Sequence, residues 1–94
     1  MRLVLEGLEK DVDVILVTVD MSAINSNVSP GVSYPSVVGG LTMEEVKEIS
    51  FLVGSSKKAR VIGVSEFNPA VEAKKTGSLA VEIYYEFVRG FSMR

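Results

Sequence analysis

The sequence predicts a small α/β domain in which two parallel strands alternate with helices. Two apolar runs rich in β-branched residues, at 14–19 and 60–64, are typical of strands. The segment between them contains a strong helix-capping signal, so the strands should be parallel and joined by a right-handed crossover. With helices also expected at 1–10 and 75–89, the element order is α-β-α-β-α. We expect residues 1–94 to form one domain.

The first two elements are predicted from the spacing of their apolar residues. Apolar side chains recur at helical spacing within residues 1–10. Residues 14–19, Val-Ile-Leu-Val-Thr-Val, form a β-branched, mostly apolar run, which is typical of a strand buried on both faces of a parallel sheet. Asp20 follows this run directly. A long loop is then predicted at 21–40, and loops of this length in compact domains are often functional.

The middle helix is predicted from the signals at its two ends. Thr42 is a good N-cap, and Glu45 three residues later completes a capping box. Leu41 and Val46 occupy the two positions of a hydrophobic staple. Gly54 follows the apolar stripe and is predicted to be the glycine that ends the helix.

The second strand and the last helix complete the predicted order. The strand at 60–64 is followed closely by Glu66. The last helix is predicted over 75–89 from a wide apolar stripe, with Thr76 as a candidate N-cap. Gly90 is predicted to end this helix.

The composition excludes several classes of function. The net charge is −2 and no basic patch stands out, so we expect no nucleic-acid partner. No apolar run approaches the roughly 20 residues of a membrane span, and the amino terminus does not resemble a signal peptide. Cysteine and histidine are both absent, which excludes thiol catalysis and Ser-His-Asp machinery within this chain. A chain without cysteine is compatible with a cytoplasmic location, which we expect.

Two carboxylates lie where α/β proteins bind ligands. Asp20 follows the first predicted strand and Glu66 the second. Ligands of open α/β sheets bind outside the carboxyl ends of the strands, and adjacent parallel strands would bring these two residues close together. The carboxylates could hold a metal ion or a cationic substrate group. The alternative is that each one only caps a strand or a helix.

Four segments in the same region resemble motifs of one enzyme family. Residues 18–31, Thr-Val-Asp-Met-Ser-Ala-Ile-Asn-Ser-Asn-Val-Ser-Pro-Gly, are similar to the ureohydrolase signature Ser-x-Asp-x-Asp-x-x-Asp-Pro-x-x-Ala-Pro-Gly. Residues 32–42 end in the family's Gly-Gly-Leu-Thr, 63–69 contain its Glu-x-Asn-Pro, and 75–80 resemble the opening of its last helix. The chain therefore resembles the carboxyl-terminal part of the arginase, agmatinase and formimidoylglutamase family. This resemblance implies the last part of an arginase-like three-layer α/β/α fold.

The resemblance also implies a chemistry, and it shows what this chain lacks. Family members use two manganese ions, held by histidines and aspartates, and a bridging hydroxide that attacks a guanidino or formimino carbon. Asp20 matches the first aspartate of the family's Asp-x-Asp pair, but Ser22 stands in place of the second. Glu66 matches the glutamate that faces the cationic part of the substrate. The histidine-bearing segments are missing, so we expect no catalytic residue and no complete manganese site in this chain.

The sequence leaves open which member of the family the chain resembles most and whether the chain is active. Gly-Val-Ser-Tyr-Pro at 31–35 favours formimidoylglutamase-like members. Tyr34 lies on the predicted loop and could contact a substrate, but we expect it to pack within the loop. The chain could be an inactive fragment of a larger enzyme, one subunit of a split manganese hydrolase, or a non-enzymatic binding or assembly module. Two strands leave two unpaired sheet edges, so we expect either a homo-oligomer or a complementing amino-terminal half.

Overall fold

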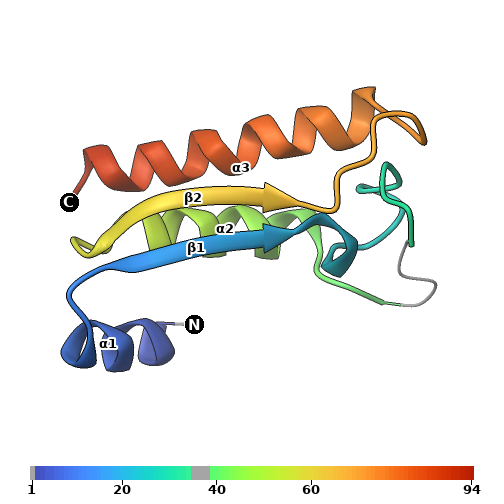
Figure 1. Ribbon diagram of the computed structural model, residues 1–94. Helices are drawn as coiled ribbons and strands as arrows, with labels where there is room; N and C mark the ends of the chain where they lie inside the picture. Colours follow the sequence, from blue (N-terminus) through green and yellow to red (C-terminus); the bar gives the residue numbers. More distant parts are fainter. Residues whose placement is uncertain (1, 35–38) are drawn as a thin grey trace.

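The computed structural model describes residues 2–34 and 39–94, and its elements follow the predicted order (Figure 1). The elements are α1 (Arg2–Asp11), β1 (Ile15–Asp20), the 3₁₀-helix η1 (Met21–Ala23), α2 (Met43–Gly54), β2 (Ala59–Ser65) and α3 (Lys74–Ser92). Part of the predicted loop, including Pro35, lies outside the described residues. No helix of the described part is long and apolar enough to cross a membrane.

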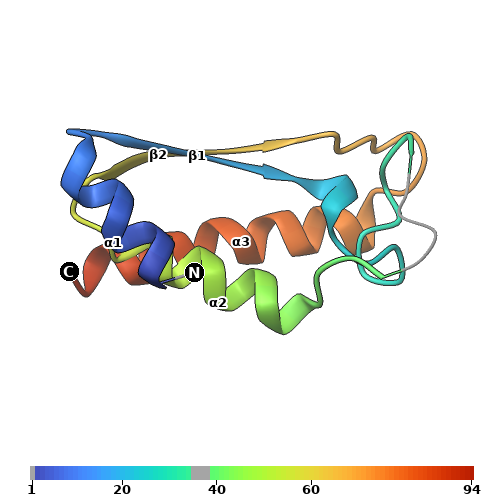
Figure 2. The same cartoon turned by 90° about the horizontal axis from the view of Figure 1, so that it is seen from below.

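The two strands form a parallel sheet, which confirms the predicted topology. The helices all lie on one side of this sheet (Figure 2). As a result, β1 is buried on one face only, contrary to the prediction. Leu16 is 71% exposed and its partner across the sheet, Val61, is 55% exposed. The apolar run of β1 therefore has one face that nothing in residues 2–34 and 39–94 covers.

The start of α2 confirms the predicted capping box. The Thr42 hydroxyl accepts a hydrogen bond from the Glu45 backbone N–H at 3.1 Å, and the Glu45 carboxylate accepts one from the Thr42 N–H at 2.9 Å. Leu41 and Val46 both pack in the hydrophobic core, as a staple requires. Two backbone donors at the helix start are therefore satisfied locally.

Gly54 and Gly90 do not end their helices in the way the sequence suggested. The residue after Gly54 has right-handed helical geometry, with a φ of −75° at Ser55, and α3 continues past Gly90 to Ser92. Both glycines lie where α2 and α3 pack against each other. A Cβ atom on Gly54 would lie 2.1 Å from the Phe87 carbonyl oxygen, and one on Gly90 would lie 2.3 Å from the Phe51 carbonyl oxygen. These glycines allow the two helix backbones to touch.

The core consists of two clusters between the helices and the sheet. The larger one joins α2 and α3 to the segment that follows β1, through the buried residues Met21, Ile24, Val32, Val46, Leu79 and Ile83. The smaller one joins α1 to the far end of the sheet, through Leu5, Ile15, Val53, Ala59 and Phe87. The larger cluster therefore supports the backbone around Asp20.

Thr76 has a different role from the predicted N-cap. The N-cap position of α3 is Ala73, and Thr76 is fully buried in the first turn. Its hydroxyl accepts a hydrogen bond from the Gly31 N–H at 2.7 Å and donates one to the Glu72 carboxylate at 2.7 Å. Glu72 also accepts from the backbone N–H groups of Lys75 and Thr76, at 2.6 and 2.9 Å, and so caps the helix. Thr76 thus fastens the long loop to α3.

Replacing Thr76 by valine should destabilise the domain by about 1–3 kcal/mol. Valine has nearly the same shape, but it leaves the buried Gly31 N–H without an acceptor. Urea denaturation of the Thr76→Val variant would measure the loss. The Thr76→Ser variant keeps the hydroxyl and should retain most of the stability. Equal losses in the two variants would contradict the assigned role of the hydrogen bond.

Candidate functional site

The structure places Asp20 and Glu66 at the same edge of the sheet. Asp20 is the last residue of β1 and is paired in register with Ser65, the last residue of β2. Glu66 is the next residue along the chain. The parallel pairing thus puts the two carboxylates beyond the carboxyl ends of neighbouring strands, as the sequence predicted. This is where α/β sheets bind their ligands.

Asp20 is already engaged by the residue that replaces the second aspartate. One Asp20 carboxylate oxygen accepts hydrogen bonds from the Ser22 hydroxyl at 2.6 Å and from the Ser22 N–H at 2.9 Å. Asp20 is also the N-cap of η1, so the capping alternative raised from the sequence is realised here. The hydroxyl bond and then the backbone bond from Ser22 lower the pKa of the Asp20 carboxyl below its ordinary value. Asp20 is therefore held as a carboxylate by its own turn.

Glu66 has an unusual backbone. Its φ of +66° lies in the left-handed region, which glutamate seldom adopts. Its side chain is exposed, and it has no hydrogen bond or ion pair with the part of the chain that the structure describes. Strained backbone of this kind is concentrated at ligand-binding sites. The carboxylate of Glu66 is therefore available to a cationic group from outside.

Contacts on both sides of Glu66 hold its backbone in place, and on the amino-terminal side Ser65 is paired with Asp20 in the sheet. Val32 of the long loop forms an antiparallel bridge with Phe67. The Asn68 N–H donates to the Gly31 carbonyl at 2.6 Å, and the Asn68 side-chain amide donates to the Ser33 hydroxyl at 3.0 Å. The loop that follows Asp20 is thus clasped to the segment that follows Glu66. The clasp was not predicted from the sequence, where Asn68 and Pro69 stood out only as part of the Glu-x-Asn-Pro motif.

Tyr34 lies at the end of the clasped segment and is 85% exposed. The expectation that it packs within its own loop is therefore wrong, and the side chain is accessible, as the alternative of a substrate contact requires. The preceding residue, Ser33, is held by Asn68, so the backbone presents Tyr34 to solvent. No sequence signal distinguished this orientation from packing.

The described residues do not by themselves fit a manganese site. Manganese prefers several oxygen or imidazole ligands. No group of three or more His, Cys, Asp or Glu side chains that could hold a metal occurs within residues 2–34 and 39–94. Asp20 offers one carboxylate, with one oxygen bonded to Ser22. Ser22, at the position of the family's second aspartate, therefore hydrogen-bonds to Asp20 itself.

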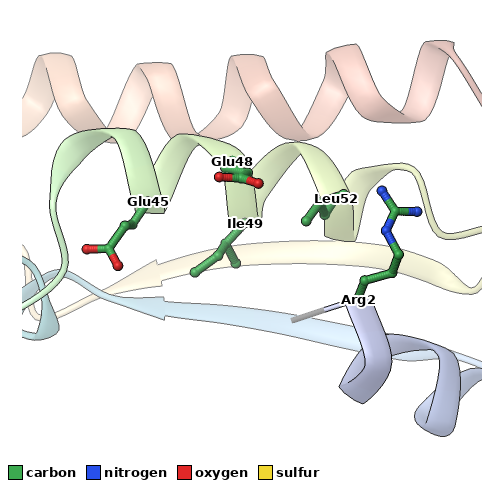
Figure 3. Close-up of a pocket in the computed structure, with 5 residues that line it drawn as sticks. All are labelled: Arg2, Glu45, Glu48, Ile49 and Leu52. Carbon is green, nitrogen blue, oxygen red and sulfur yellow. The ribbon is translucent and has the colours of Figure 1, made fainter.

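Among the hollows that adjoin α2, one faces α1 and another faces β1, where it reaches Asp20. The first, of about 390 Å³, lies between α1 and α2 and is lined by Arg2, Glu45, Glu48, Ile49 and Leu52. Figure 3 shows Arg2 extending from α1 toward α2, where the two glutamates and the two apolar side chains lie. The second, of about 370 Å³, lies under β1 and includes Asp20 at one end. Glu66 lines neither of these two hollows.

Replacing Ser22 by alanine should raise the pKa of Asp20 toward its ordinary value. The variant removes the hydroxyl bond, which is the largest cause of the lowered pKa, and keeps the backbone bond. Titration of the Asp20 side-chain carboxyl by carbon-13 NMR would measure the change. Ser22→Thr retains a hydroxyl and serves as the control. An unchanged Asp20 pKa in Ser22→Ala would show that the hydroxyl bond does not form in solution.

Comparison with known proteins agrees with the sequence motifs. The Arginase family model matches residues 1–89. The formimidoylglutamase of Staphylococcus haemolyticus is 39% identical over 79 residues, which is 83% of this chain and 25% of that protein. A crystal structure of Trypanosoma cruzi formiminoglutamase with Mn²⁺ matches 97% of this chain and 33% of its own, with a TM-score of 0.83 and 32% identity. Arginase from Bacillus caldovelox matches 88% of this chain and 28% of its own, with a TM-score of 0.81 and 25% identity.

The matches also define how much of the fold is present. This chain spans about a quarter of the length of its staphylococcal relative and about a third of the trypanosomal structure. The family match covers both strands, α1, α2, most of α3 and the segments that carry Asp20 and Glu66. On the family match and the fold together, the chain belongs to the arginase family.

Proposed function

We propose that this chain is the carboxyl-terminal part of a formimidoylglutamase-like amidinohydrolase. In this role it contributes to the hydrolysis of a C–N bond in a guanidino or formimino substrate. It is inactive without the rest of the fold, because it has one metal-binding carboxylate and no histidine. The formimidoylglutamase relatives favour a formimino substrate.

The observation that carries the proposal is the placement of Glu66 beside the end of β1. Its carboxylate is exposed, and its left-handed backbone is held by the clasp between the long loop and the segment 67–68. A fixed carboxylate can bind a cationic amidine by charge-assisted hydrogen bonds. We assign Glu66 as the substrate-binding residue of this chain.

The trypanosomal structure contains Mn²⁺, which supports a manganese centre in the complete fold. Asp20 would supply one carboxylate to such a centre, and the other ligands would come from residues outside this chain. Ser22 adds no charge, and it holds one oxygen of Asp20. We therefore assign no reaction step to a metal held by residues 1–94 alone.

Calorimetry and an activity assay on the purified chain test its dependence on the rest of the fold. We expect no stoichiometric Mn²⁺ binding and no release of formamide from N-formimidoylglutamate. Tight binding of even one Mn²⁺ per chain would contradict this expectation. The intact staphylococcal relative, assayed in parallel, is the control for substrate and metal.

A chimera tests the assigned residues directly. The matched segment of the staphylococcal relative is replaced by the corresponding residues of this chain, and kcat/KM is measured with Mn²⁺. We expect Ser22→Asp to raise kcat/KM at least tenfold, because it supplies a second carboxylate in place of a neutral hydroxyl. Glu66→Gln in the same background should lower it at least tenfold. A chimera that stays inactive with Ser22→Asp, although folded, would contradict the proposed function.

A second candidate function is a non-enzymatic assembly module. The bond between Ser22 and Asp20 and the uncovered face of the sheet favour it, because neither feature serves hydrolysis. A folded chimera that is inactive in every variant would support this candidate instead.

A further inference from the structure

Tyr34 and Glu66 belong to two segments that run side by side beyond the ends of β1 and β2 (Figure 1). Val32 and Phe67 form an antiparallel bridge, so the chain runs in opposite directions on its two sides. In that register Ser33 lies opposite Glu66. Tyr34 is the next residue along the chain. The long loop therefore carries a tyrosine past the carboxylate at the ligand-binding edge of the sheet.

The Tyr34 side chain is not used by the fold. It is 85% exposed, so its ring buries little apolar surface and contributes little to stability. Its hydroxyl has no hydrogen-bond partner among residues 2–34 and 39–94. The backbone before it is nevertheless fixed, because the Ser33 hydroxyl accepts a hydrogen bond from the Asn68 side-chain amide at 3.0 Å. A fixed segment thus presents an aromatic ring that is free to contact a ligand.

Glu66 supplies the charge that would attract such a ligand. Its carboxylate is exposed, and no lysine or arginine of the described ranges pairs with it. A carboxylate binds the N–H groups along the edge of an amidinium or guanidinium ion by charge-assisted hydrogen bonds. These ions are planar, so their faces stay open when the edge is bound. The face of a tyrosine ring attracts a cation placed over it.

We propose that Tyr34 and Glu66 together form a site for a planar amidinium or guanidinium cation. Glu66 binds the edge of the cation, and the ring of Tyr34 covers one of its faces. The inference deepens the proposed function and rests on it, because it gives the substrate-binding carboxylate an aromatic partner. Such a site selects a planar cation over an alkylammonium ion, which carries the same charge but has no flat face.

Titration of the 94-residue chain with acetamidinium chloride measures the affinity of the site, through the amide NMR shifts of Glu66 and Phe67. Methylammonium chloride at the same concentrations supplies a cation without a flat face and controls for ionic strength. We expect saturable binding of acetamidinium and weaker binding of methylammonium. Retained dispersion of the NMR spectrum shows that each variant is folded.

Substitutions separate the ring from the charge. Tyr34→Ala should weaken acetamidinium binding about two- to fivefold, the range expected for an exposed cation–π contact. Tyr34→Phe keeps the ring and should bind as the wild type does. Glu66→Gln removes the charge and should weaken binding more than Tyr34→Ala. Tyr85→Ala is the matched control, since it removes a tyrosine of α3 that is 63% exposed, and it should leave the affinity unchanged.

The outcomes distinguish this inference from the proposed function. Absence of saturable binding, equal affinities for the two cations, or equal affinities of wild type and Tyr34→Ala would each overturn the inference. A loss in Tyr34→Phe as large as that in Tyr34→Ala would also overturn it, because the ring would then not be the binding group. Binding that depends on both residues, together with a folded chimera that stays inactive with Ser22→Asp, would support the site and contradict the hydrolase assignment.

Discussion

Replacing Gly90 by alanine is expected to destabilise the domain by about 3 kcal/mol. The added Cβ would lie 2.3 Å from the Phe51 carbonyl oxygen and 2.8 Å from the Ser55 nitrogen, and both are backbone atoms that cannot rotate away. Helices α2 and α3 would have to separate, which disrupts packing along their whole contact. A domain of this size has a total stability on the order of 5–15 kcal/mol, so the loss is a large fraction of it. Urea denaturation monitored by circular dichroism would measure the change.

Gly77 provides the matched control on the same helix. A Cβ at Gly77 would lie 3.6 Å from the Phe67 ring, which is an ordinary contact. Alanine is a better helix former than glycine, so Gly77→Ala should stabilise the domain by about 0.5–1 kcal/mol. The same substitution should therefore have opposite signs at two positions of α3. A loss of stability below about 1 kcal/mol for Gly90→Ala would contradict the close helix contact.

Replacing Ile83 by alanine is expected to cost about 2–5 kcal/mol. Ile83 is fully buried on α3, in the cluster that includes Met21, Ile24 and Val32 from the segment after β1. The cavity would therefore open beneath the backbone that carries Asp20. We expect both a lower denaturation midpoint and shifted NMR resonances in residues 20–34.

Val81 on the same helix is the control for Ile83. It is 67% exposed, so Val81→Ala should change stability by no more than about 0.5 kcal/mol. Ile83→Val should fall between the two, at about 0.5–1.5 kcal/mol. Equal effects of Ile83→Ala and Val81→Ala would show that the larger cluster does not form in solution.

The candidate site was predicted only in part from sequence motifs. The positions of Asp20 and Glu66 were predictable, because residues after parallel strands gather at one edge of the sheet. The bond from Ser22 to Asp20 and the left-handed φ of Glu66 were not predicted. Neither feature produces a periodic pattern in the sequence, because each depends on the conformation of one turn and on the residues that contact it. The clasp through Asn68 joins residues 35 positions apart and was likewise not predicted.

The sequence by itself determined the order of the elements, the capping box at Thr42 and Glu45, and the family. Each of these depends on residues that are close together in the sequence. Tertiary structure decided the roles of Gly54, Gly90 and Thr76, all of which looked like helix-end signals. Two of them are contact points between helices, and the third fastens the long loop to α3. Tertiary structure also decided that β1 is covered on one face, since burial depends on which layers are present and not on the apolar run itself. The physical reason is common to all four cases. A local sequence signal limits the backbone conformations that a residue can adopt. Packing against residues distant in the sequence then decides which contacts that residue makes.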